Sequence, residues 1–148
     1  MDMSSERLKL NNQGCFRLYT AARLMMQAYQ PLLAPLGITY TQYLVLMVLW
    51  EQDAQPLNAI SRRLYLESNT LTPLIKRMEA IKLVVRRKNK DDARQTIVAL
   101  TEHGRALEQH AAHVPDCMTD MLCGKGLDTE SFAAVMPTLD RLIEILSK

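Results

Sequence analysis

Residues 65–100 read YLESNTLTPLIKRMEAIKLVVRRKNKDDARQTIVAL, and their pattern decides the fold class. In the first half, apolar residues recur at three- and four-residue spacing after Ser68, a residue type that caps helices, which predicts an amphipathic helix. In the second half, two runs rich in β-branched and apolar residues, 83–88 and 95–100, flank the polar stretch 89–94, which predicts a β-hairpin with a charged tip. The helix residues predicted to face inward are Leu71, Leu74, Ile75, Met78 and Ile81.

A shorter helix is predicted directly upstream, because Leu57, Ile60 and Leu64 share one helical face and residues 65–67 make a turn. Two short helices joined by a tight turn are typical of a helix-turn-helix. With the hairpin behind it, the pattern predicts a mainly α fold with a small β-hairpin, a winged helix-turn-helix.

Further helices are predicted upstream of this unit. Thr39 and Gln42 match a capping box, so the apolar run 43–50 is predicted to be a buried helix. Before it, one long first helix is predicted to end near Pro31 or Pro35. Its apolar stripe is narrow, as in a helix that packs on a partner helix, and consists of Leu8, Cys15, Leu18, Ala22, Met25, Tyr29 and Leu32.

The C-terminal third is also predicted to be helical. Thr101 is predicted to cap a fifth helix that runs at least to His113 and toward Leu122, and Asp128 or Thr129 to cap a sixth. Because both terminal helices present apolar faces, we expect these faces to meet each other or a second copy of the chain, which indicates a homodimer. The stripe of the last helix consists of Phe132, Val135, Met136, Leu139, Leu142, Ile143 and Leu146.

Length and composition indicate one domain, because 148 residues with 48% hydrophobic content are enough for one core. We expect a single domain over 1–148, with dimerisation helices over about 1–36 and 115–148 and the winged helix-turn-helix over about 39–100. No apolar run reaches the ~18 residues of a membrane span and none resembles an export signal, so a cytoplasmic protein is expected. Three cysteines are too few for a disulfide framework, so any disulfide is expected to be transient.

Basic residues gather in one segment. Between Lys76 and Arg94 there are eight basic and three acidic residues, whereas the net charge of the whole chain is only +2. Taken alone, such a cluster is explained equally well by a solvated charged face and by a nucleic-acid surface. Its position on a helix-turn-helix favours double-stranded DNA as the partner.

The helix that begins at Ser68 is the predicted recognition helix. Short hydrogen-bonding side chains at its start and cations further on suit base edges and phosphates in a major groove. The hairpin tip is predicted to lie along the neighbouring backbone or minor groove, where Asp92 either orients Arg94 through an ion pair or is an ordinary turn residue. The predicted DNA-binding residues are Ser68, Asn69, Thr70, Thr72, Pro73, Lys76, Arg77, Arg86, Lys88, Lys90, Asp92 and Arg94.

The runs 65–82, 89–94 and 98–107 resemble the MarR family of winged-helix repressors, whose D-x-R wing motif is matched by Asp92 and Arg94. Residues 11–51 resemble the organic hydroperoxide resistance regulators within that family. The resemblance implies a homodimeric repressor that binds operator DNA and is released when an organic hydroperoxide oxidises a reactive cysteine at the Cys15 position. It also implies that tyrosines match Tyr19, Tyr29 and Tyr40. Tyr19 lies one turn after Cys15, and Tyr29 and Tyr40 are expected to approach this cysteine across the dimer interface.

The chemistry of such a sensor requires a thiolate, because the thiolate is the form that attacks a peroxide O–O bond. Tyrosine hydroxyls that hydrogen-bond the charged sulfur of Cys15 lower its pKa, and Phe16 and Trp50 are expected to line an apolar entrance. Without the resemblance, the pattern favours Cys15 as a small core residue, and the tyrosines are explained equally well by interface packing. For the resolving cysteine, Cys123 is favoured because MLCGKGL resembles that region of two-cysteine regulators, and Cys117 stays a candidate.

Three alternatives to this hypothesis stay open. His110, His113 and Cys117 lie at helical spacing, so a metal sensor is conceivable, although the pattern is weak and no metal is expected. A small phenolic ligand could release the DNA instead of oxidation. A thiol peroxidase would turn over peroxide at Cys15, but the basic hairpin would then have no purpose. We therefore expect no enzyme activity and no cofactor.

Overall fold

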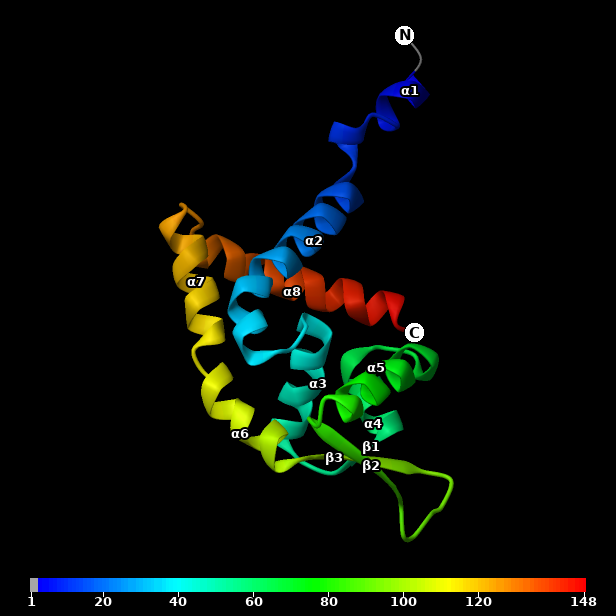
Figure 1. Ribbon diagram of the computed structural model, residues 1–148. Coiled ribbons are helices and arrows are strands. Elements are labelled where there is room, and N and C mark those ends of the chain that lie inside the picture. Colours follow the sequence, from blue (N-terminus) through cyan, green and yellow to red (C-terminus); the bar gives the residue numbers. More distant parts are fainter. Residues whose placement is uncertain (1–2) are drawn as a thin grey trace.

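The computed structural model describes residues 3–148 and shows a mainly helical chain with one small sheet (Figure 1). No single helix among these residues is long and apolar enough to cross a membrane, and the one helix pair that passes by length and composition is bent by 68°. The elements are α1 Met3–Arg7, the 3-10 helix η1 Leu10–Asn12, α2 Gly14–Leu33, the 3-10 helix η2 Ala34–Leu36, α3 Tyr40–Glu51, β1 Gln55–Pro56, α4 Leu57–Leu64, α5 Ser68–Ala80, β2 Val84–Lys88, β3 Thr96–Leu100, α6 Glu102–Ala111, α7 Val114–Gly124 and α8 Thr129–Leu146.

The predicted winged helix-turn-helix is confirmed. The helices α4 and α5 are joined by a turn, and β2 and β3 form an antiparallel hairpin that pairs Val84 with Leu100 at its root and Lys88 with Thr96 toward its tip. The structure adds the strand β1, which pairs Gln55 with Val98 on the other side of β3. A two-residue strand has no alternation of apolar and polar residues, so hydrophobic periodicity cannot detect it.

The core lies between α3, α5 and the hairpin root. Helix α3 is apolar on nearly every face and is buried along its length, as the run 43–50 predicts. Predicted inward residues of α5 are buried, except Ile81, which is 44% exposed because the helix ends at Ala80 and the chain turns outward there. The largest fully buried side chains are Leu33, Leu46, Leu49, Ile60, Leu71, Ile75, Met78, Leu83, Val45, Val84, Val98 and Val114.

Helix starts follow the predicted caps with one exception. The capping box is present, since the Thr39 hydroxyl accepts from the backbone N–H of Gln42 and the Gln42 side chain accepts from that of Thr39. Thr101 caps α6 and Asp128 caps α8, in both cases through a side-chain oxygen. Ser68 is instead the first residue of α5, and Glu67 precedes it as the N-cap without a side-chain bond.

The predicted long first helix is present as α2, which ends at Leu33 as expected, but its predicted start is wrong, because the chain leaves the helical path between α1 and α2. Side chains there bond backbone carbonyls that a helix would use: the Asn12 amide donates to Glu6, and the Arg17 guanidinium donates to Asn11. Leu8 consequently lies outside α2 and is 82% exposed. The fifth helix is likewise divided into α6 and α7, with Pro115 in the first turn of α7.

The terminal helices lie apart from this core. In Figure 1, α1 and the first turns of α2 project away from the rest of the chain, while α8 crosses α2 and ends beside the helix-turn-helix. The last turns of α8 line a shallow pocket with Tyr65 at the end of α4. No residue of α8 is buried, and its apolar stripe includes Phe132 at 42% and Ile143 at 43% exposure.

Candidate DNA interface and redox pocket

The outward face of α5 carries the predicted recognition residues. Thr72 is half-buried between the turns, and the other predicted residues of this helix are exposed. The core side of α5 is fixed by Leu71, Leu74, Ile75 and Met78, so the exposed face has a defined orientation. The exposed recognition residues are Ser68, Asn69, Thr70, Pro73, Lys76 and Arg77.

At the tip of the hairpin, Asp92 orients Arg94. The carboxylate oxygen Oδ1 of Asp92 accepts from the backbone N–H of Arg94 at 3.1 Å and from its Nε at 3.2 Å. The Arg94 side chain is nonetheless 92% exposed, so its remaining N–H groups are free to reach a partner. Both interpretations of Asp92 are therefore present, because the bond to the backbone N–H is that of a turn aspartate and the bond to Nε is an ion pair.

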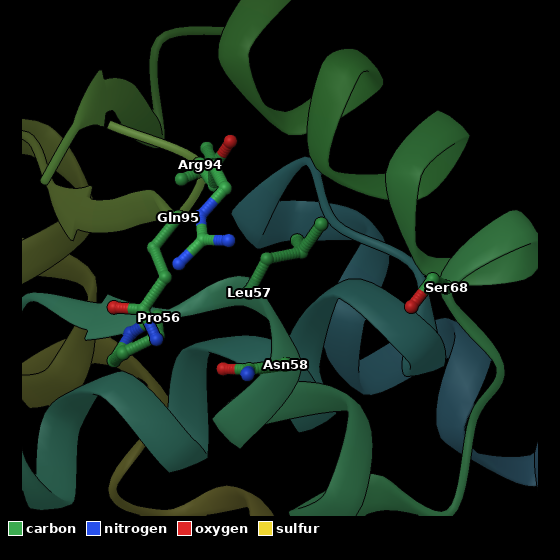
Figure 2. Close-up of a pocket in the computed structure, with 7 residues that line it drawn as sticks. Pro56, Leu57, Asn58, Ser68, Arg94 and Gln95 are labelled. Atoms are coloured by element: carbon green, nitrogen blue, oxygen red, sulfur yellow. The ribbon is translucent and has the colours of Figure 1, made fainter. Parts of the chain in front are cut away.

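Arg94 also lies at a small cavity that joins the wing to the helix-turn-helix. Figure 2 shows Arg94 and Gln95 from the wing, Asn58 near the start of α4 and Ser68 at the start of α5 around one space. The cavity has a volume of about 160 Å³. Sequence reasoning missed Asn58, because nothing in the pattern of α4 brings its start near the wing. The residues that line this small cavity are Pro56, Leu57, Asn58, Ser68, Arg94, Gln95 and Thr96.

Arg86 differs from the other predicted DNA residues, because it is paired within the protein. Its Nη2 lies 3.1 Å from Oε1 of Glu79 on α5, and its backbone N–H donates to the other carboxylate oxygen at 3.2 Å. The hydrogen bonds and charge of Arg86 lower the pKa of Glu79. The pair therefore joins the recognition helix to strand β2, whereas Lys88 and Lys90 stand exposed toward the tip.

Cys15 is exposed in the first turn of α2, in the part of the helix that projects from the body. Tyr19 follows one turn later and is 66% exposed, and Phe16 is 41% exposed. A single chain thus leaves the predicted sensing cysteine and two of its predicted pocket residues open to solvent. Within one chain, Cys15, Phe16 and Tyr19 do not line the cavity that contains Tyr29 and Tyr40.

Tyr29 and Tyr40 line a large apolar cavity between α2, α7 and α8. The cavity has a volume of about 600 Å³, and the two rings lie 4.8 Å apart between centroids. Burial raises the pKa of both hydroxyls, so they stay protonated and can donate hydrogen bonds. Cys123 shares this lining, whereas Cys117 does not. The lining consists of Met25, Tyr29, Tyr40, Pro115, Met118, Thr119, Leu122, Cys123, Leu127, Thr129, Phe132, Ala133 and Met136.

Trp50, which is predicted to line the peroxide entrance, does not line this cavity. It lies at the far end of α3, where its Nε1 donates to the carbonyl of Gly104 at 3.0 Å and its ring lies 6.3 Å from that of Tyr43. Tyr40 and Trp50 are separated along the helix axis, because an α-helix rises by about 1.5 Å per residue.

The geometry gives no support to the metal-sensing alternative. Within residues 3–148, no three His, Cys, Asp or Glu side chains are grouped so that they could hold a metal ion together, which includes His110, His113 and Cys117.

Comparison with known proteins places the chain among transcriptional regulators. The profile of the transcriptional regulator SarA/Rot family matches residues 27–110. The chain is 38% identical over 139 residues to the organic hydroperoxide resistance transcriptional regulator of Bacillus subtilis, covering 94% of this chain and 95% of that protein.

Two solved structures of the regulator AbfR, a protein of Staphylococcus epidermidis, cover nearly the whole chain. The reduced form bound to DNA is 37% identical with a TM-score of 0.77, covering 99% of each chain. The form with a disulfide is 40% identical with a TM-score of 0.64, covering 95% of this chain and 97% of that one. At nearly equal identity, the chain therefore has a conformation closer to the DNA-bound form.

Proposed function

Because the chain belongs to the MarR family of winged-helix transcriptional regulators and is a relative of the organic hydroperoxide resistance regulators, we propose that it is a homodimeric repressor. It binds double-stranded operator DNA when reduced. Oxidation of Cys15 by an organic hydroperoxide releases the DNA, and the resulting sulfenic acid is resolved by a cysteine of the second subunit.

A second copy of the chain accounts for the open terminal helices. Helix α8 has 18 residues, none of them buried, and α2 buries only Leu33 of its 20 residues. Helices owe most of their stability in proteins to the packing of an apolar face, so these two require a partner surface. Residues of about 1–36 and 115–148 are accordingly the dimerisation region, as their stripes predict.

In such a dimer, each subunit presents α5 to a major groove and its wing to the adjoining backbone or minor groove. The exposed face of α5 and the oriented Arg94 supply the contacts. A dimer reads two half-sites about 34 Å apart, so a change at the dimer interface alters the spacing of the two recognition helices.

The observation that carries the redox proposal is the shared cavity of Tyr29, Tyr40 and Cys123. Cys15 of the same chain lies outside it on a projecting helix. In the homodimer, the projecting segment of one subunit places Cys15 at the cavity of the other. There the two neutral hydroxyls donate to the thiolate, and the apolar lining admits the organic part of the oxidant.

The proposed reaction has two steps. The Cys15 thiolate attacks the outer oxygen of the hydroperoxide, the O–O bond breaks, and an alcohol leaves after taking up a proton, so that sulfur becomes a sulfenic acid. The thiol of Cys123 on the partner subunit then attacks this sulfur, forming a disulfide and releasing water. Cys117 is the second candidate for that step, being half-buried on the same helix α7.

The test measures binding to a labelled DNA fragment from upstream of the protein's own gene. The fluorescence anisotropy of this DNA is recorded at stated salt, before and after one equivalent of cumene hydroperoxide is added. Wild type should bind and then be released, whereas Cys15→Ser should bind and stay bound. Release of both proteins to the same extent would refute a role for Cys15. Unresponsive wild type would refute oxidative control altogether.

The size of the cavity also favours a second candidate function, release by a small phenolic ligand. Small-molecule sites commonly have volumes of about 300–1,000 Å³, and this one lies in that range. A ligand of this kind would release the Cys15→Ser variant from operator DNA as readily as wild type. Oxidation at Cys15 would release only wild type.

A further inference from the structure

Helix α3 connects two parts of the molecule that the proposed function uses separately. Tyr40, Tyr43, Met47 and Trp50 follow three- and four-residue steps and so share one face of the helix. The Tyr40 end lines the apolar cavity, and the ring of the buried Tyr43 lies 6.2 Å from Tyr29 and 6.3 Å from Trp50. A continuous row of aromatic rings therefore runs from the cavity to the other end of α3, about 18 Å away.

At that other end, α3 and the residues behind it hold the chain that leaves the wing. The indole N–H of Trp50 donates to the carbonyl of Gly104 at 3.0 Å. The carboxylate of Asp53 accepts from the backbone N–H of Leu100 at 2.8 Å and from the Arg105 guanidinium at 2.8 Å. These bonds lower the pKa of Asp53, so the carboxylate is charged at neutral pH.

The partners of Trp50 and Asp53 are the root of the wing. Leu100 is the last residue of β3, and Leu83 immediately precedes β2. Thr101 joins the two strands, because its backbone N–H donates to the Leu83 carbonyl at 3.0 Å. Gly104 packs so tightly on that carbonyl that a Cβ would lie 2.1 Å from its oxygen. A displacement of Gly104 or Leu100 consequently moves both strands of the wing.

We propose that Trp50 and Asp53 are positioning residues for DNA binding, which hold the wing root so that Arg94 meets the DNA, and that α3 transmits the state of the tyrosine cavity to them. Neither residue lies on the face predicted to contact DNA. The transmission half rests on the proposed redox function, whereas the positioning half requires only that the wing binds DNA. A closely packed, mostly buried helix suits this role, since its packing resists bending and a displacement at one end is passed to the other.

The positioning half is tested with reduced protein in a double-mutant cycle. Trp50→Phe keeps an aromatic ring, although a smaller one, and removes the N–H, and Asp53→Asn keeps the size and removes the charge. Each should weaken operator binding about 5- to 10-fold when Arg94 is present, and less than about twofold in the Arg94→Ala background, because the substitutions act through the wing.

A residue with a merely structural role would give a different pattern. Its substitution would weaken binding by the same factor in both backgrounds, and that result would overturn the proposal. Arg63→Ala is a matched control, since it removes the exposed ion pair of α3 with α4, between Glu51 and Arg63, without touching the wing root. It should leave operator binding unchanged in either background.

The transmission half has a spectroscopic readout, because Trp50 is the only tryptophan of the chain. Its emission should shift when cumene hydroperoxide is added to wild type and should not shift in Cys15→Ser. In Trp50→Phe, the ratio of operator Kd after and before oxidation should fall at least about threefold below that of wild type. An unchanged emission or an unchanged ratio would overturn transmission through α3.

Failure of the two proposals can be told apart. If peroxide does not release wild type from DNA, the redox function fails and transmission fails with it, while the cycle with Arg94→Ala still decides the positioning role. If wild type is released but Trp50→Phe behaves identically, the redox function stands and only the role of α3 is wrong.

Discussion

The winged helix-turn-helix and the terminal helices differ in how far one copy of the chain buries them. Helix α3, the inner face of α5 and the root of the hairpin enclose a continuous core with residues such as Leu46 and Ile75 fully buried. No residue of helix α8 is buried, although some of its side chains line the tyrosine cavity. The core of the DNA-reading part is thus complete in one chain, whereas we propose that a second chain completes the sensing part.

The largest expected effect lies in the complete part. Gly104→Ala would force a Cβ against the Leu83 carbonyl, a backbone atom that cannot move aside, and should cost about 3 kcal/mol or more in the free energy of unfolding. Urea denaturation measures this. Gly124→Ala in α7 is the matched control, since nothing lies within 4 Å of its Cβ. Equal stability of the two variants would contradict the tight wing root.

The next prediction addresses the incomplete part. Ile143→Glu places a charge on the exposed stripe of α8 and should shift the chain from dimer to monomer, with a dissociation constant raised at least about tenfold. Sedimentation at several protein concentrations measures the change. Glu144→Gln changes a neighbouring charged residue of α8 that does not belong to the apolar stripe, and it should leave the dimer intact. A stable Ile143→Glu dimer would show that α8 is not the interface.

The third prediction separates reading of DNA from assembly. Arg94→Ala should weaken operator binding about tenfold and reduce its salt dependence, while the dimer stays intact. Arg141→Ala removes an equally exposed arginine from α8 and serves as the control in the same anisotropy titration. Operator affinity equal to wild type in Arg94→Ala would show that the wing assignment is wrong.

The smallest effect concerns pH and the core-side contact of Asp53. Because hydrogen bonds lower the pKa of Asp53 in the folded chain, its stabilisation is present above the usual value of 3.8 and is lost as pH falls below it. Asp53→Asn should therefore be less stable than wild type at pH 7 by only about 1 kcal/mol, since the side chain is 33% exposed and solvent screens the interaction, and this difference in the free energy of unfolding should narrow at pH 3. A gap that stays constant would contradict a charged Asp53.

Much of the DNA-reading part could be predicted from sequence, because local signals and tertiary packing agree there. The capping box at Thr39, the apolar run behind it and the β-branched runs of the hairpin each specify one structure. Sequence alone did not show whether Asp92 forms an ion pair with Arg94, and the structure contains that ion pair.

The parts that sequence missed depend on contacts between distant segments. Strand β1 exists only because β3 pairs with it, and Asn58 lines one cavity with Arg94 only because the folded chain brings the start of α4 near the wing. The hydrogen bond from Trp50 to Gly104 likewise joins segments that are distant in sequence. The break before α2 came from side chains that bond the backbone, which periodicity does not detect.

In the proposed dimer, Cys15 of one subunit meets the cavity of the other at Cys123. The most direct measurement mixes two variants in a Cys117→Ser background, one with Cys15→Ser and the other with Cys123→Ser, and adds cumene hydroperoxide before a non-reducing gel. Neither variant alone should crosslink, whereas the exchanged mixture should give a covalent dimer joined by Cys15 and Cys123. A mixture that stays monomeric on the gel would contradict the claim.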